Sequence, residues 1–248
     1  MVAAVKLLRH VGRSRAGRFL AEGPNLVEAA VARGLAIEVF ATEDAVARYA
    51  SLTAGVPLQL VTERAAKALS DTVTPAGLVA VCELPTPILA DALRGDPGLV
   101  AVAVGISEPG NAGTLIRIAD AMGAAAVVLA GHAVDPYNGK CLRASTGSIF
   151  GLPVVSEPDA VAAVAALHEA GLRVLATTVD GEIDLADAEL AGPTAWLFGP
   201  EAQGLPADVA ALADQRVRIE MPGNAESLNV AAAAAICLYQ SARARNST

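Results

Sequence analysis

The first third of the chain alternates short apolar runs with amphipathic segments of helical period. Apolar positions spaced by two predict strands, and apolar positions spaced by three or four predict helices. The segment NLVEAAVARG ends at Gly34, a residue type that often terminates helices. This pattern predicts a small layered α/β structure. The expected strands cover residues 18–23, 35–42, 56–61 and 77–84, and the expected helices cover 25–34, 43–52 and 62–69.

A stretch with three prolines and two glycines, PTPILADALRGDPG, interrupts this pattern. We place a first domain at residues 1–90, a linker at 91–98 and a second domain at 99–248. From Leu99 the apolar runs become continuous, as in LVAVAVG and AAVVLAG, which suits a mostly parallel sheet with helices on both faces. The expected strands cover 99–105, 125–131, 173–179, 195–199 and 216–221, and the expected helices cover 114–122, 159–171 and the alanine-rich C-terminal segment.

Composition changes this picture little. The hydrophobic fraction of 54% does not predict a membrane protein, because alanine supplies much of it and no run of about 18 strongly apolar residues is present. Basic residues occupy the N-terminal segment, where a signal peptide would need an apolar core. We therefore expect a cytoplasmic protein. Cys82, Cys141 and Cys237 lie far apart without metal-ligand spacing, so free thiols are expected.

Charge is distributed unevenly along the chain. The net charge is -8, which disfavours a polyanionic partner if it is averaged over the whole chain. Binding of nucleic acid depends instead on local neutralisation of phosphates, and residues 1–21 hold five basic residues and no acidic residue. The alternative is a solvated basic helix. The candidate nucleic-acid contacts are Lys6, Arg9, Arg13, Arg15 and Arg18.

Polar residues gather in the loops that follow strands of the second domain, where open α/β sheets bind ligands. In GISEPGNAGTLIR, Asn111 and Arg117 enter a helix, and an arginine near a helix N-terminus can grip a phosphate. The alternative is that Asn111 caps this helix and that Arg117 pairs with Asp120 on its surface.

Two further loops carry polar residues. In LFGPEAQGLP, glycine would let the backbone approach a ligand closely, although an ordinary turn is the alternative. In MPGNAESLN, one helix cap would explain Ser227 but would leave Glu226 and Asn229 unexplained. Nucleotide-binding glycine motifs are absent, and the scattered histidines support neither a metal site nor a histidine-based triad.

Taken in this order and spacing, the three loops resemble the motifs of the SpoU (TrmH-like) family of RNA ribose 2′-O-methyltransferases, in the SPOUT superfamily. EPGNAGTLIR matches the first motif, LFGPEAQGL the second and IEMPGNAESLNVAAAAAI the third, and LRASTGSIFGLPV extends the match between the first two. FLAEGPNLVEAA and LSDTVTPAGLVAV are similar to the ribosomal-protein-like substrate-binding domain of this family. The resemblance therefore covers nearly the whole chain.

The resemblance implies an α/β fold in which a small ribosomal-protein-like domain precedes a SPOUT parallel sheet with a C-terminal trefoil knot. It implies S-adenosylmethionine as cofactor, no metal, and a homodimer whose active site is completed across the interface. The implied catalytic residues are Asn111, Arg117, Glu201, Ser227 and Asn229. The implied cofactor contacts are Thr177, Leu197, Gly199, Ile219, Met221 and Leu228.

The reaction would be an in-line displacement, in which the protein aligns the cofactor methyl group with the ribose hydroxyl. In the family, the arginine that matches Arg117 is proposed as general base. Deprotonating a guanidinium at pH 7 costs at least about 7 kcal/mol, so we favour a charged arginine that grips the phosphate beside the target ribose. A structured RNA is the expected substrate, and ribosomal RNA is favoured over transfer RNA. The alternatives are an RNA-binding protein without activity and a small-molecule enzyme such as a dehydrogenase.

Overall fold

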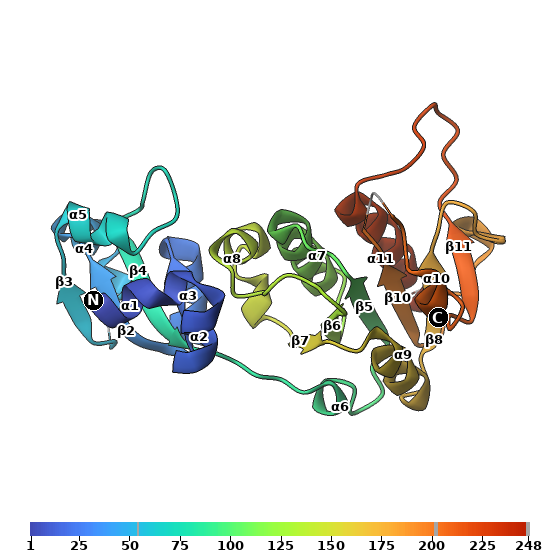
Figure 1. Ribbon diagram of the computed structural model, residues 1–248, viewed down its shortest axis with the longest axis horizontal. Helices are drawn as coiled ribbons and strands as arrows, with labels where there is room; N and C mark the ends of the chain where they lie inside the picture. Colours follow the sequence, from blue (N-terminus) through green and yellow to red (C-terminus); the bar gives the residue numbers. More distant parts are fainter. Residues whose placement is uncertain (54, 201–202, 247–248) are drawn as a thin grey trace.

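The computed structural model describes residues 1–53, 55–200 and 203–246, and two sheets lie side by side in it (Figure 1). The sheets belong to opposite ends of the chain, and the segment between Glu83 and Leu99 joins them along one side. This segment contains one short helix, α6 (Leu89–Ala92). No helix in the described ranges has the length and apolar character needed to cross a membrane.

The N-terminal part is a four-stranded sheet with the strand order β1-β4-β2-β3 within the described residues. Strand β4 is antiparallel to both of its neighbours, and β2 and β3 are parallel. Its strands are β1 (Arg18–Glu22), β2 (Ala36–Ala41), β3 (Leu58–Leu60) and β4 (Leu78–Glu83), and its helical segments are α1 (Val2–Val5), η1 (Lys6–Leu8), α2 (His10–Ala16), α3 (Pro24–Ala32), α4 (Glu43–Arg48), η2 (Ala50–Leu52) and α5 (Glu63–Ala68).

The C-terminal part is a parallel sheet with the strand order β7-β6-β5-β10-β8-β11-β9 among the described residues. Because the strands are parallel, their carboxyl ends meet at one edge of the sheet. The α/β class with a large parallel sheet, expected from the sequence, is confirmed. The strands are β5 (Leu99–Val104), β6 (Ala126–Ala130), β7 (Val154–Glu157), β8 (Arg173–Thr177), β9 (Ile183–Asp184), β10 (Thr194–Phe198) and β11 (Gln215–Arg218).

Helices cover both faces of this sheet, as the continuous apolar strands require. Alternate residues of β5 divide between two core clusters: Ala101 packs with α7 and α11, and Val102 packs with α9 and α10. On the first face, Trp196 is completely buried and its indole N–H donates to Ser241 Oγ of α11 at 2.8 Å. The helical segments are α7 (Pro109–Ala121), α8 (Gly139–Ser145), η3 (Ser148–Phe150), α9 (Ala160–Glu169), η4 (Leu185–Asp187), α10 (Ala207–Ala210) and α11 (Val230–Asn246).

Several element boundaries differ from the sequence-based expectation. The helix expected at 114–122 begins at Pro109, because Glu108 caps it and proline is well suited to the first helical turn. The strand expected at 216–221 ends at Arg218, because the neighbouring strands β8 and β9 end at the same level and offer no further backbone partners. Residues 219–229 therefore form a loop, which projects beyond the sheet before α11 begins (Figure 1).

The two parts share a packed interface. The ring of Phe19 in β1 lies 4.9 Å from the ring of Tyr137 and 5.9 Å from that of Phe150, both from the C-terminal part. Burial raises the pKa of the Tyr137 hydroxyl, and the nearby Asp135 carboxylate raises it further. The aromatic contacts bring the N-terminal sheet and the segment around α8 into one continuous core cluster.

Candidate functional site

A cavity of about 600 Å³ lies at the carboxyl ends of β8, β10 and β11, against the start of α11. Three loops enclose it, those after β8, after β10 and after β11. This is the edge at which ligands of parallel α/β sheets bind. The sequence-predicted residues that line it are Thr177, Gly199, Ile219, Met221, Ser227 and Leu228.

Leu197 does not line this cavity. Its side chain is completely buried in β10, and its carbonyl oxygen accepts a hydrogen bond from Thr177 Oγ1 at 2.8 Å. The hydroxyl of Thr177 therefore already has a protein partner. The next residue, Thr178, also lines the cavity, but its Oγ1 is buried and has no hydrogen-bond partner among the described residues.

Gly199 shapes the cavity wall for a local reason. A Cβ atom there would lie 2.5 Å from the Gly204 carbonyl carbon and 2.5 Å from the Leu205 nitrogen. Gly204 has a φ of +66° and donates its N–H to the Pro200 carbonyl at 2.8 Å. Glycine is thus needed for the loop to fold back on itself. Glu201 lies in this loop but outside the described residues.

Asn229 joins the loop after β11 to the start of α7. Its Oδ1 accepts hydrogen bonds from the N–H groups of Ala231 at 3.0 Å and Ala232 at 3.4 Å, so it caps α11. Its Nδ2 donates to Asn111 Oδ1 at 3.1 Å. The two asparagines, 118 residues apart, are therefore in direct contact, and the cap is Asn229 rather than Ser227, which lines the cavity.

The start of α7 is organised by Glu108. Its carboxylate accepts from the Gly110 N–H at 3.3 Å and from Lys140 Nζ at 2.5 Å. The hydrogen bond from Lys140 holds the pKa of Glu108 below its usual range, and the one from Gly110 adds to it. Asn111 therefore lies inside the first turn of α7, and its expected alternative role as the cap of this helix is taken by Glu108.

Gly113, one turn further along α7, permits a close helix contact. A Cβ atom at this position would lie 2.3 Å from the Cys141 carbonyl oxygen and 2.7 Å from Ala144 Cβ, both in α8. This glycine thus serves packing between α7 and α8.

Arg117 is exposed on α7 and does not line the cavity within one chain. It forms no ion pair with any residue in the described ranges, so the alternative pairing with Asp120 is absent there. The loops after β8, β10 and β11 thus come together at the cavity, and Asn111 joins them through Asn229, whereas Arg117 projects elsewhere.

The basic N-terminal segment is divided by the fold. Lys6, Arg9, Arg15 and Arg18 are exposed. Arg13 is 4% exposed, and its Nη2 lies 2.5 Å from Asp135 Oδ2 while its Nη1 donates to the Leu7 carbonyl at 2.9 Å. Arg13 as an RNA contact stays a prediction that its burial disfavours, because its guanidinium already forms an ion pair between the two parts of the chain.

The structure also tests the expectation for the cysteines. Cys82, Cys141 and Cys237 are free and buried, as predicted, and burial raises the pKa of the first two thiols to about 12. Sequence reasoning missed Thr178, although its position at the end of a predicted strand was a usable signal. A second cavity, of about 860 Å³, shares Pro200, Gln203 and Gly204 of the loop after β10 with the first cavity, and none of the predicted site residues is among its described lining residues.

Two family signatures match the chain. That of the SpoU rRNA Methylase family covers residues 98–239, and that of the MRM3-like substrate binding domain covers residues 3–80. The chain is 34% identical to the 23S rRNA (guanosine(2553)-2′-O)-methyltransferase RlmP of Bacillus subtilis over 227 residues, which is 92% of this chain and 89% of the relative. It is 42% identical to the 23S rRNA (uridine(2479)-2′-O)-methyltransferase of Streptomyces viridochromogenes over 144 residues, 56% of this chain and 50% of the relative.

Solved structures agree with these matches. The crystal structure of an RNA 2′-O ribose methyltransferase superimposes with a TM-score of 0.87 and 35% identity, covering 99% of this chain and 95% of that one. The SpoU methyltransferase AviRb from Streptomyces viridochromogenes, in complex with the cofactor AdoMet, gives 0.86 and 33%, covering 99% of this chain and 98% of that one.

Proposed function

Because the chain belongs to the SpoU rRNA Methylase family, we propose that it transfers a methyl group from S-adenosylmethionine to a ribose 2′-hydroxyl of RNA, with ribosomal RNA favoured over transfer RNA. The observation that carries this proposal is the cavity at the carboxyl edge of the parallel sheet, enclosed by three loops and tied to α7 by the contact between Asn229 and Asn111.

The cavity fits the cofactor in size and in chemistry. About 600 Å³ is within the range of small-molecule sites. Ile219, Met221 and Leu228 offer apolar contacts, and Thr178 offers a hydroxyl that has no hydrogen-bond partner in the part of the chain that the structure describes. Asp180 and Glu226 line the same cavity, and their negative charge suits a ligand that carries a sulfonium and an ammonium group. We assign the cofactor contacts to Thr177, Gly199, Ile219, Met221 and Leu228. The buried Leu197 would act on the cofactor site through its carbonyl, which accepts the hydrogen bond from Thr177.

Bound S-adenosylmethionine supplies an activated methyl group, so the protein's task is alignment and removal of the hydroxyl proton. We assign the RNA-facing wall to Asn111, Ser227 and Asn229, and include Glu201 by resemblance. Arg117 keeps its positive charge and grips the phosphate beside the target ribose, which lowers the pKa of the hydroxyl, and phosphate or water takes the proton.

In a homodimer, Arg117 of one subunit would reach the cavity of the other subunit. Arg117 lies on α7, which packs against α11, and α11 exposes Ile236 (37% exposed) and Tyr239 (55% exposed). Large apolar side chains exposed on one helix suit a subunit interface. We propose that α7 and α11 pair with a second copy, that Arg117 reaches the partner's site, and that the C-terminal segment carries the trefoil knot of the family.

We propose that residues 1–90 bind the substrate RNA and that residues 99–248, after the linker 91–98, carry out catalysis. The exposed cations Lys6, Arg9, Arg15 and Arg18 support this division, because neutralising phosphates supplies most of the affinity of such proteins for RNA. We propose a cytoplasmic protein, because this is where it would meet a ribosomal substrate.

The test is transfer of a labelled methyl group from S-adenosylmethionine to ribosomal RNA and, separately, to transfer RNA. We expect label in ribosomal RNA from the native chain, and at least about a hundredfold less from Arg117→Lys, which keeps the charge but loses the planar fork. Label confined to transfer RNA would reverse the substrate assignment. Binding of RNA without any transfer would identify an RNA-binding protein that lacks activity.

A further inference from the structure

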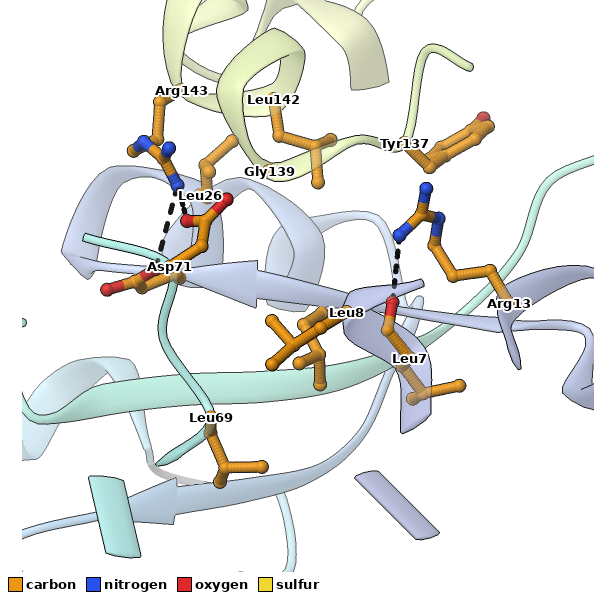
Figure 2. A pocket seen from close by; sticks show the side chains of 12 residues that line it. Leu7, Leu8, Arg13, Leu26, Leu69, Asp71, Tyr137, Gly139, Leu142 and Arg143 are labelled. Atoms are coloured by element: carbon orange, nitrogen blue, oxygen red, sulfur yellow. Dashed lines mark hydrogen bonds and ion pairs between the residues drawn. The ribbon is translucent and has the colours of Figure 1, made fainter. Parts of the chain in front are cut away.

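A second ionic contact, besides that of Arg13, joins the two parts of the chain beside a small leucine-lined pocket (Figure 2). Arg143 of α8 donates from Nη1 to Asp71 Oδ1, and the same nitrogen lies 3.7 Å from Glu22 Oε2. Asp71 follows α5, and Glu22 ends β1, so both carboxylates come from the N-terminal part. Neither role was predicted from the sequence.

The carboxylate of Glu22 is held in place by its own side of the interface. Its side chain is 11% exposed, and its Oε1 accepts from Ser70 Oγ and from Thr72 Oγ1, the latter at 2.8 Å. Ser70 and Thr72 flank Asp71. Arg143 therefore contacts a hydrogen-bonded unit that fixes the base of the loop between α5 and β4.

The backbone on the C-terminal side is shaped for this contact. At Gly139, the first residue of α8, a Cβ atom would lie 2.7 Å from Asp71 Oδ2 and 3.1 Å from Arg143 Nη1. At Gly147, which has a φ of +96°, a Cβ atom would lie 3.3 Å from Ala29 Cβ of α3. Two glycines thus allow α8 and the turn after it to approach the N-terminal part closely.

The loop that Arg143 anchors projects from the N-terminal part (Figure 1). It carries Val73, which is 94% exposed. Helix α8 packs in turn on α7, which carries Asn111 and Arg117. One guanidinium therefore connects the loop of the N-terminal part with the helix that supports the candidate site.

We propose that Arg143 is a positioning residue: by pairing with Asp71 and Glu22 it fixes the orientation of the N-terminal part relative to the methyl-transfer site, so that RNA held by one reaches the other in register. This inference rests on the proposed RNA methyl transfer. Arg143 is not among the described residues that line the cofactor cavity, and its ion pairs within the described part of the chain are with Asp71 and Glu22, so its loss would weaken productive RNA binding without changing the chemistry.

The test compares Arg143→Gln and Asp71→Asn with the double charge exchange Arg143→Asp/Asp71→Arg. Arg173→Gln is the matched control, because Arg173 forms a similarly exposed ion pair with Glu189 inside the C-terminal part. We expect KM for RNA to rise at least about fivefold in both single variants, with kcat changed less than about twofold. We expect the double exchange to bring KM for RNA most of the way back to its native value and the control to match the native chain in KM and kcat. All variants should bind S-adenosylhomocysteine as the native chain does.

A distance measurement separates orientation from affinity. Spin labels on Val73→Cys and Glu169→Cys report the spacing of the two parts, because the native thiols are buried. Arg143→Gln broadens the distance distribution, and Gly139→Ala, which displaces the Asp71 carboxylate without removing charge, broadens it as well. An unchanged distribution together with an unchanged KM overturns the proposal. Failure of the native chain to methylate RNA refutes the proposed function instead, and the distance distribution still tests the contact.

Discussion

Among the described residues, Asn229 makes two kinds of contact that substitution can separate. Its Oδ1 caps α11 and its Nδ2 donates to Asn111. Asn229→Ala removes both, at about 1 kcal/mol for the cap and about 1 kcal/mol for the hydrogen bond, so the free energy of unfolding should fall by about 2 kcal/mol. Asn229→Asp keeps the cap acceptor beside the positive end of the helix and loses only the donor, so it should lose about 1 kcal/mol or less.

The assay pairs unfolding with methyl transfer. The single tryptophan, Trp196, is buried against α11 and reports urea unfolding through its fluorescence. Both variants should lose at least about tenfold in methyl transfer, because each breaks the contact that joins the third loop to α7. Asn224→Ala, an exposed change in the same loop, should match the native chain in both assays. Native-level transfer by Asn229→Asp would refute the reasoning, since the donor to Asn111 would then be dispensable.

Three further outcomes follow from the geometry. Gly113→Ala should lower the free energy of unfolding by about 1–3 kcal/mol, measured by urea unfolding, because the added methyl group meets the carbonyl of Cys141; native stability would contradict that contact. Thr178→Val should weaken S-adenosylhomocysteine binding, measured by calorimetry, at least about fivefold, and should weaken it more than Thr178→Ser, which keeps the hydroxyl. Equal affinity of the Thr178→Val variant and the native chain would exclude a contact to this hydroxyl. Burial alone would raise the pKa of Asp135, but hydrogen bonds from His10 and Arg13 hold it below its usual range. The stability that the Asp135 carboxylate contributes is therefore present above about pH 4 and is lost as the pH falls through its lowered pKa. Between about pH 4 and pH 2, the free energy of unfolding of the native chain should therefore fall by more than that of Asp135→Asn.

The sequence was sufficient for the fold class because period and composition are local properties. Continuous apolar runs predicted the central strands β5, β6 and β10, and the structure buries all of their residues. It was less informative where pairing with distant strands decides the outcome. Strand β7, four residues long at the sheet edge, was missed, and β11 was drawn three residues too long.

In the candidate site, too, some features could be predicted from local sequence and others depend on distant elements. Residues just after strands, such as Gly199 and Ile219, could be placed at one edge because parallel strands all point there. The function of a glycine could not be predicted: Gly113 and Gly199 accommodate neighbouring backbone, which depends on elements distant in sequence or on loop closure. The ion pair of Arg13 could not be predicted for the same reason, since its partner Asp135 is 122 residues away.

We propose that the loops after β8, β10 and β11 form one site that methylates a ribose hydroxyl. The most direct measurement is nucleoside mass spectrometry of ribosomal RNA after incubation with the protein and methyl-labelled S-adenosylmethionine. We expect the label in a single 2′-O-methylnucleoside, and we expect it to be absent when Asn111 or Asn229 is replaced by alanine. Label on a base nitrogen or carbon, or undiminished transfer by those variants, would contradict it.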